Sequence, residues 1–228
     1  MRLQLRLKAP RETVPFNHLH ILAGALHKWL GPNEEHDGLS LYSFSWLQGA
    51  RPQGDGLRFP KGAGWFISAL DGDFLARSIS GIFRDPGIRW GLEVEHAGLV
   101  KLPIFPEGIS EQRFLLASPI LIKRSIPNAA KPGGMEEKHH LYTDPESDAL
   151  LTETLRHKLR AAGFDDTDAA VRFDRAYPKA RTQKVMYREI GNMANYCPVL
   201  VTGTAEQLAF AWTVGMGSST GVGFGSLV

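Results

Sequence analysis

The stretch Arg2-Leu3-Gln4-Leu5-Arg6-Leu7-Lys8 alternates apolar and polar side chains, which is typical of a β-strand with one face against a core. A longer segment follows in which apolar residues recur at helical spacing from about Pro15 to Leu30. Gly31-Pro32 then ends the helical pattern. The start of the chain therefore predicts a strand followed by a helix.

The next part of the chain extends this unit with further strands and one more helix. The patterns predict strands over 39–47, 64–70 and 88–102, a helix over 72–84, and a loop rich in Gly and Pro over 49–62. The resulting order, β-α-β-β-α-β, is that of a ferredoxin-like domain.

The second half of the chain repeats this order less regularly, with one additional strand near 169–176. Its predicted elements are strands at 114–122, 169–176, 182–190, 194–202 and 222–227, and helices at 145–162 and 205–214. Pro103, Pro106 and Gly108 mark a boundary between the halves. We therefore predict an α+β fold of two tandem ferredoxin-like domains, similar to RNA-recognition motifs and with facing sheets. The domains are 1–104 and 110–228.

The composition is that of an ordinary globular protein. The 228 residues are 43% apolar and 22% charged, with a net charge of +2. The single cysteine, Cys197, rules out an internal disulfide, and no apolar run approaches the roughly 18 residues needed to span a membrane. The alternating N-terminus is unlike a signal peptide. These features predict a cytoplasmic protein without a membrane partner.

Basic side chains accompany several predicted strands. One face of a ferredoxin-like sheet is free of helices, and RNA-recognition motifs bind unpaired bases there. That face would carry Arg6 in the first half, with Lys123, Arg124, Lys184 and Arg188 in the second. Sheet edges also carry Lys and Arg for solubility. The pattern alone leaves an RNA-binding face and a plain solvated face equally open.

The most distinctive segment is Gly215-Met216-Gly217-Ser218-Ser219-Thr220-Gly221-Val222-Gly223-Phe224-Gly225, which we call the glycine-rich loop. Closely spaced glycines let backbone N–H groups approach a phosphate or a base. A helix C-cap followed by an edge strand is the plainer interpretation. The loop is no Walker motif, because it runs from helix to strand and no Lys-Ser/Thr follows. We predict RNA contacts from its residues Gly217, Ser218, Ser219, Gly221 and Gly223.

The loop also carries a resemblance to a known family. Its pattern of Gly-hydrophobic-Gly, five residues and Gly-hydrophobic-Gly resembles the C-terminal signature of the RAMP superfamily. Within it, the chain resembles the CRISPR-associated endoribonucleases that process repeat RNA. Weaker similarities are the first strand, Val14-Pro15-Phe16-Asn17-His18 at the first helix, and Ser118-Pro119-Ile120. The resemblance covers essentially the whole chain.

The resemblance implies an activity and its partners. Family members cut RNA without a metal or other cofactor, by attack of the 2′-hydroxyl on the adjacent phosphate, which leaves a 2′,3′-cyclic phosphate. Such a site needs a base, an acid and positive charge for the transition state. The expected partner is precursor CRISPR repeat RNA, with other effector subunits as further partners. The chain itself would be a monomer or a homodimer.

The resemblance also implies site residues. His27, late in the first helix, and His36, in the following loop, match two family positions, and we assign them as general base and general acid. Some members carry a lysine where this chain has Leu39-Ser40. Ser40 can donate a hydrogen bond to phosphate but brings no charge. Lys28 or Arg6 then becomes the candidate for the missing positive charge.

Several alternatives remain open at this stage. His20 lies near the azimuth of His27 and is a reserve candidate. A zinc site of His20, His27 and His36 would lack the cysteines and fourth ligand usual in structural sites, so we predict no metal. Two other functions compete with the nuclease. One is a non-catalytic RNA-binding subunit of an effector complex, and the other is a metabolite-binding protein whose glycine-rich loop holds a small anion.

Overall fold

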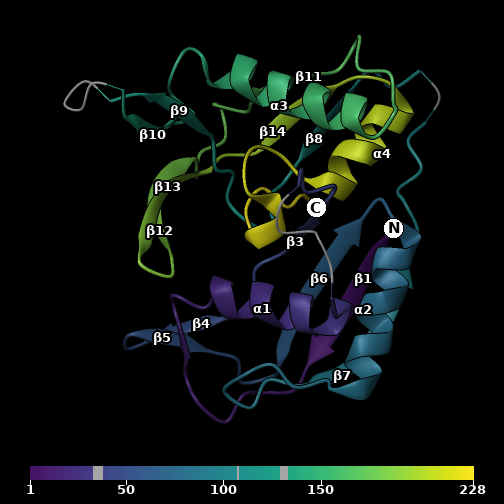
Figure 1. The fold of residues 1–228 in the computed structure, drawn as a ribbon, viewed down its shortest axis with the longest axis vertical. Helices are drawn as coiled ribbons and strands as arrows, with labels where there is room; N and C mark the ends of the chain where they lie inside the picture. The colour runs from purple at the N-terminus through teal and green to yellow at the C-terminus, as the bar shows by residue number, and fades with distance from the viewer. Residues whose placement is uncertain (33–37, 107, 129–132) are drawn as a thin grey trace.

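The computed structural model describes residues 1–32, 38–106, 108–128 and 133–228. The N-terminal and C-terminal halves of the chain are stacked along the longest axis of the molecule (Figure 1). Apolar side chains form two buried clusters, one made mainly by each half. The boundary predicted between residues 104 and 110 stays a prediction.

The N-terminal half is a four-stranded antiparallel sheet with two helices. Its strands β1 (Arg2–Leu7), β3 (Tyr42–Phe44), β6 (Ala63–Ala69) and β7 (Val94–Val100) lie in the order β3-β6-β1-β7. Helices α1 (Leu19–Leu30) and α2 (Gly72–Arg84) share a buried cluster with the apolar side of β1. This arrangement is the one that the alternating pattern of the first strand predicted.

The predicted loop over 49–62 is wrong in part, because it contains a hairpin. Strands β4 (Arg51–Gln53) and β5 (Gly56–Arg58) pair across a turn at Gly54, which has φ +58°. Strand β2 (Val14–Pro15) pairs with β5, so α1 begins at Leu19 rather than near Pro15. All three residues of β4 are exposed, so the hairpin lacks the apolar alternation that reveals a strand.

The C-terminal half has a three-stranded sheet in the order β11-β14-β8. Its elements are β8 (Glu111–Phe114), α3 (Ser147–Ala161), β11 (Ala170–Phe173), β14 (Val199–Thr202) and α4 (Ala205–Val214). The predicted strand over 222–227 is replaced by a 3-10 turn, η1 (Thr220–Val222), and a single bridge from Leu227 to Leu116. That bridge places the end of the chain beside β8, where the fourth strand of a ferredoxin-like sheet would lie.

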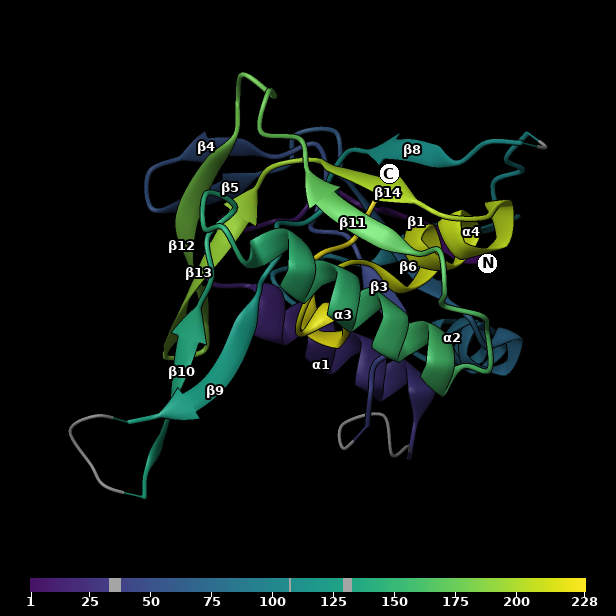
Figure 2. The same cartoon turned by 90° about the horizontal axis from the view of Figure 1, so that it is seen from above.

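Two hairpins extend from this half (Figure 2). They are β9 (Lys123–Pro127) with β10 (Met135–His139), and β12 (Arg181–Tyr187) with β13 (Ile190–Tyr196). The prediction that the strand near 169–176 is the additional one is therefore wrong, because β11 belongs to the central sheet. Alternation identifies a strand but does not tell which partner it pairs with.

Arg2 joins the two halves. It lies on β1 but is only 4% exposed, with its guanidinium carbon 3.8 Å from the ring centre of Phe66 and 3.5 Å from that of Trp212 on α4. It donates hydrogen bonds to the carbonyl oxygens of Leu227 and Trp212. Burial lowers the pKa of Arg2 to about 9. The C-terminal half thus covers part of the sheet face predicted to be free, while Arg6 on the same strand stays exposed.

Candidate functional site

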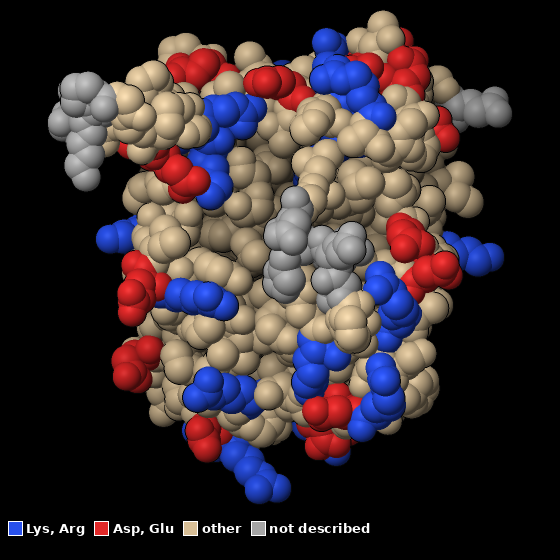
Figure 3. Space-filling model, in the orientation of Figure 1, with Lys and Arg blue, Asp and Glu red and all other residues tan. Residues whose placement is uncertain are grey.

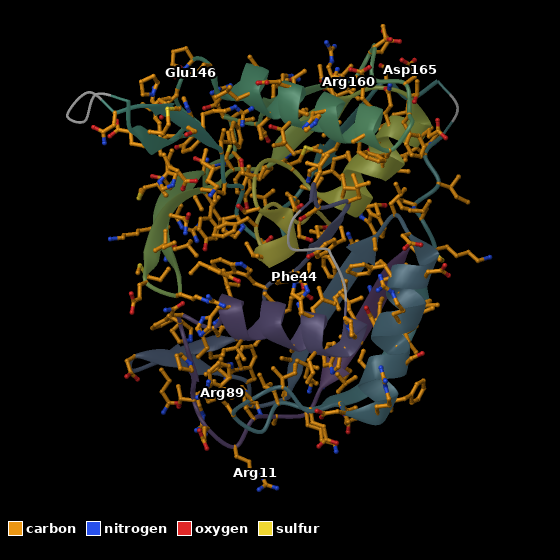
Figure 4. The ribbon with its side chains drawn as sticks, viewed as in Figure 1. Arg11, Phe44, Arg89, Glu146, Arg160 and Asp165 are labelled. Carbon is orange, nitrogen blue, oxygen red and sulfur yellow. The ribbon has the colours of Figure 1, made fainter. Side chains whose placement is uncertain are left out.

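The glycine-rich loop lies where the two halves meet. Phe44, at the centre of this junction in Figure 4, packs so closely on the loop that a Cβ at Gly223 would lie 2.8 Å from its ring. A Cβ at Gly221 would meet the Ser40 hydroxyl, and one at Gly217 would meet the Leu121 carbonyl. Gly217 and Gly223 also have φ values of +75° and +97°, which favour glycine. Close packing therefore requires glycine at these positions.

Hydrogen bonds hold the loop from both sides. The indole N–H of Trp46 donates to the Gly223 carbonyl at 2.8 Å, and the backbone N–H of Ser218 donates to the Leu121 carbonyl at 2.7 Å. Gly217, Gly221 and Gly223 are buried, whereas Ser218 and Ser219 are half-buried. The predicted RNA contacts of all five residues stay predictions, and the two serines offer the more accessible surface.

A buried lysine beneath the loop was missed by the sequence analysis. Lys158 of α3 is 3% exposed, and its ammonium donates to the Thr220 hydroxyl at 2.9 Å and to the Val214 carbonyl at 3.2 Å. Burial lowers the pKa of Lys158 to about 7. The helical spacing could have indicated that Lys158 is buried, because it follows Leu151 and Leu155 on the apolar side of α3.

The candidate catalytic groups lie on or after α1. His27 is half-buried in the last turn of this helix, and Ser40 contacts the loop at Gly221. Leu19 of α1 also packs against the loop, since it lies 3.3 Å from where a Gly223 Cβ would sit. The structure therefore brings α1, Ser40 and the loop together. His36 lies outside the described residues.

His18 and His20 occupy different environments at the start of α1. His18 is buried, with Nδ1 2.9 Å from the Pro15 carbonyl oxygen. His20 is half-buried and makes an edge contact with Tyr187 of β12 at 6.3 Å between ring centres. Burial, followed by the charges of Arg188 and Arg89, lowers the pKa of His20. A neutral imidazole is the form that a general base needs, so His20 keeps its place as a reserve candidate.

Most of the predicted basic residues are engaged within the protein. Lys28 pairs with Asp85 at 2.8 Å, Lys123 with Glu137 at 2.8 Å, and Arg124 with Glu153 at 3.0 Å. Arg6 donates to the Lys61 carbonyl, while the Arg188 carbonyl accepts from Asn17 and so ties the β12–β13 hairpin to the segment just before α1. Lys184 on β12 is exposed. The structure thus places these residues on separate elements, namely β1, α1, β9 and the β12–β13 hairpin.

The surface between the halves is hollowed, and Lys and Arg side chains lie along one side of the hollow (Figure 3). Such a concave basic surface can follow a phosphate backbone. The Arg188 end of the β12–β13 hairpin and the segment just before α1 meet through the Asn17 hydrogen bond. The arrangement suits a polyanion that contacts both halves at once.

Three other residues have the geometry of metal ligands. Within the described ranges, ligand atoms of His140, Asp144 and Glu146 all lie within 4.8 Å of one another. Lys138 already pairs with Glu146 at 3.3 Å, and the group sits where β10 leads into α3 rather than on α1. These residues therefore belong to a different place from the candidate catalytic groups. None of the helices in the described part of the chain has the length and apolar character needed to cross a membrane.

Comparison with known proteins assigns the family. Residues 104–228 match the family model for the C-terminal part of the CRISPR-associated protein Cas6. The chain belongs to the Cas6 family. The resemblance inferred from the glycine-rich loop is thereby confirmed. No curated protein matches the chain by sequence.

Solved Cas6 structures share the fold over the full length. One described as a CRISPR-associated protein Cas6 is 21% identical with a TM-score of 0.81, covering 100% of this chain and 98% of its own. A Cas6-related protein from Pyrococcus furiosus is 16% identical, with a TM-score of 0.83 and coverage of 100% and 97%. A RAMP protein that binds different RNA substrates is also 16% identical, with a TM-score of 0.84 and coverage of 100% and 98%. These likenesses confirm the predicted α+β fold of paired ferredoxin-like domains.

Proposed function

We propose that this Cas6 family protein is an endoribonuclease that cuts precursor CRISPR repeat RNA. The observation that carries the proposal is the contact of the glycine-rich loop with α1 and Ser40, because it joins the family signature to one candidate group, Ser40, and to the helix that carries His27. The RAMP relative that binds RNA has the same fold over its full length. The hollow with basic side chains between the halves suits such a ligand.

The proposed reaction needs no metal. His27 takes the proton from the 2′-hydroxyl, whose oxygen forms a bond to the adjacent phosphorus. The bond from phosphorus to the 5′-oxygen breaks, and His36 supplies the proton to that leaving oxygen. Ser40 donates a hydrogen bond to a non-bridging phosphate oxygen. The products are a 2′,3′-cyclic phosphate and a 5′-hydroxyl.

Binding and cutting are assigned to different residues. The exposed or half-buried groups that we propose as phosphate contacts are Arg6, Lys184, Arg188, Ser218 and Ser219. Lys28, Lys123 and Arg124 would exchange their carboxylate partners for phosphate, which costs little because exposed ion pairs are weak. The buried glycines of the loop shape this surface from below.

A cleavage assay in EDTA tests the nuclease. Repeat RNA should be cut with a cyclic phosphate at the new 3′ end, and His27→Ala or His36→Ala should remove cutting by at least about 100-fold while the Kd for RNA stays within a few-fold. His20→Ala is the matched comparison on the same helix, and its loss of cutting would move the base from His27 to His20. Full activity in all three variants would rule out catalysis by these three histidines.

A non-catalytic RNA-binding subunit is the second candidate. One observation favours it: Ser40 stands where some family members carry a lysine, and it brings no positive charge. Tight binding of repeat RNA with no product after hours, and unchanged binding by the histidine variants, would establish the binder. Absence of salt-dependent RNA binding would exclude both functions.

A further inference from the structure

The turn between β10 and α3 gathers one histidine and two carboxylates. Ligand atoms of His140, Asp144 and Glu146 lie within 4.8 Å of one another. His140 directly follows β10, and Glu146 is the N-cap residue of α3. In Figure 4, Glu146 lies in the outer part of the C-terminal half, away from Phe44 at the junction. The cluster is therefore separate from the proposed site of RNA cleavage.

The backbone of His140 is held from two sides. Its N–H donates to the Ile122 carbonyl at 2.9 Å, and its carbonyl accepts from the side-chain amide of Asn195 at 3.1 Å. His140 as a whole is only 5% exposed, so its imidazole is confined by the surrounding atoms. A ligand that is already fixed loses little conformational freedom when it binds an ion.

The Nδ1 atom of His140 faces a carboxylate without a hydrogen bond. It lies 3.2 Å from Oε1 of Glu146, yet it is a buried atom with no hydrogen-bond partner among the residues that the structure describes. Buried polar atoms nearly always have a partner, so one that lacks it marks a place for a further ligand. Two ligands held at about 2.1 Å from one metal ion lie roughly 3.2–3.4 Å apart when the angle between them is near tetrahedral. The observed separation fits a shared ion.

The turn also positions the two carboxylates. Oδ2 of Asp144 accepts from the Leu141 N–H at 2.8 Å, and the Asp144 N–H donates to the Leu141 carbonyl at 2.9 Å. These bonds hold the Asp144 carboxylate beside His140 while its Oδ1 can still coordinate. The Glu146 side chain is 44% exposed and can turn toward an ion at little cost. A single short turn thus offers three ligands.

We propose that His140, Asp144 and Glu146 bind a divalent transition-metal ion of the zinc class, with water completing its coordination. The imidazole nitrogen favours Zn²⁺ over Mg²⁺ and Ca²⁺, which prefer oxygen ligands. The ion ties the end of β10 to the start of α3 and so fixes the base of the β9–β10 hairpin against the helix. This role is structural and adds no step to RNA cleavage.

Lys138 competes with the ion for this site. Its ammonium lies 3.3 Å from Oε1 of Glu146, the same oxygen that His140 approaches. The Lys138 and Glu146 side chains are 48% and 44% exposed, so their ion pair is weak and an ion can displace the lysine. Removal of the lysine should therefore strengthen metal binding. A plain ion pair of His140 with Glu146 predicts no metal binding with or without Lys138.

Calorimetric titration of the tag-free protein with Zn²⁺, in the absence of RNA, tests the site. It should show one ion per chain with a Kd on the order of 10 µM. Asp144→Asn and Glu146→Gln should each raise this Kd at least about tenfold. Lys138→Met should lower it by about two- to fivefold. Co²⁺ in place of Zn²⁺ should give visible absorption bands that both carboxylate variants lose.

His157→Ala is the matched control, because it removes an exposed histidine of α3 and should leave the Kd unchanged. Both carboxylate variants keep a side chain of the same shape, and an unchanged circular dichroism spectrum shows that they fold. Failure of Zn²⁺ to bind, equal binding by the wild type and both carboxylate variants, or equal competition by Mg²⁺ would each overturn the inference. None of these outcomes bears on the nuclease, which is assayed in EDTA.

Discussion

Replacement of Lys158 by methionine should change how the stability of the protein depends on pH. The Lys158 ammonium lies beneath the glycine-rich loop, where it donates to the Thr220 hydroxyl at 2.9 Å and to the Val214 carbonyl at 3.2 Å. Its pKa is lowered by burial, and no carboxylate in the described residues opposes that effect. Methionine has a similar length and carries no charge, so the variant isolates the cost of burying the ammonium.

The sign and size follow from the two pKa values. The pKa of Lys158 falls from 10.5 to about 7 on folding, so between these values the unfolded chain holds more protons and stability rises with pH. The difference of about 3.5 pH units corresponds to about 5 kcal/mol of destabilisation below pH 7, at about 1.4 kcal/mol per unit. About 2 kcal/mol of this cost should disappear between pH 7 and pH 9.

Urea unfolding followed by tryptophan fluorescence at pH 7, 8 and 9 measures the effect. The free energy of unfolding of the wild type should rise by about 2 kcal/mol relative to that of Lys158→Met over this range. Other titrating groups are common to both proteins and cancel in the difference. Lys179→Met removes an exposed lysine and should follow the wild type at every pH. Parallel curves for the wild type and Lys158→Met, or a wild type that gains stability relative to the variant as pH falls, would refute a desolvated Lys158.

Two further substitutions test the packing of the loop. Gly223→Ala should lower the free energy of unfolding by about 2–4 kcal/mol in the same urea assay, because its Cβ would lie 2.8 Å from the Phe44 ring at φ +97°. The control Gly24→Ala, in an exposed position of α1 with no atom within 4 Å, should instead stabilise by about 0.5–1 kcal/mol. Trp46→Phe removes the hydrogen bond to the Gly223 carbonyl and should cost about 1 kcal/mol. Unchanged stability in both Gly223→Ala and Trp46→Phe would contradict a tightly packed loop.

Helices with local capping signals were predicted to the residue. The bounds of α2 agree with the sequence because Asp71 accepts hydrogen bonds from the backbone N–H groups of Asp73 and Phe74. The start of α4 agrees because Thr204 and Gln207 form a capping box. These signals act over three residues, so they can be read without knowing the fold.

Elements stabilised by distant partners escaped prediction. The β9–β10 hairpin lies between the predicted strand at 114–122 and the predicted helix at 145–162, and none of its strand residues is buried. The terminal strand was predicted from the pattern of residues 222–227. Within this segment Gly223 instead packs against Phe44 and accepts a hydrogen bond from Trp46, both of the other half, which alternation cannot indicate.

In the candidate site, too, local features were predicted from the sequence and contacts with distant residues were not. The spacing of the glycines was enough to predict the family, because the signature is local in sequence. The role of each glycine depends on Ser40, Phe44 and Leu121, which lie about 100 residues or more away in the chain. Lys158 could be noticed on the apolar side of α3, but its contact with Thr220 requires the folded loop.

The packing of the loop changes how its variants should be interpreted. A substitution at Gly221 or Gly223 displaces Ser40 or Phe44, so lost cleavage would not by itself demonstrate a contact between the loop and RNA. Lys158 extends this dependence to α3, because the lysine supports η1 from the side opposite the N-terminal half. Ser219 is the better probe of binding. Its side chain is half-buried rather than buried, so a change in RNA affinity there can be compared with the free energy of unfolding of the same variant.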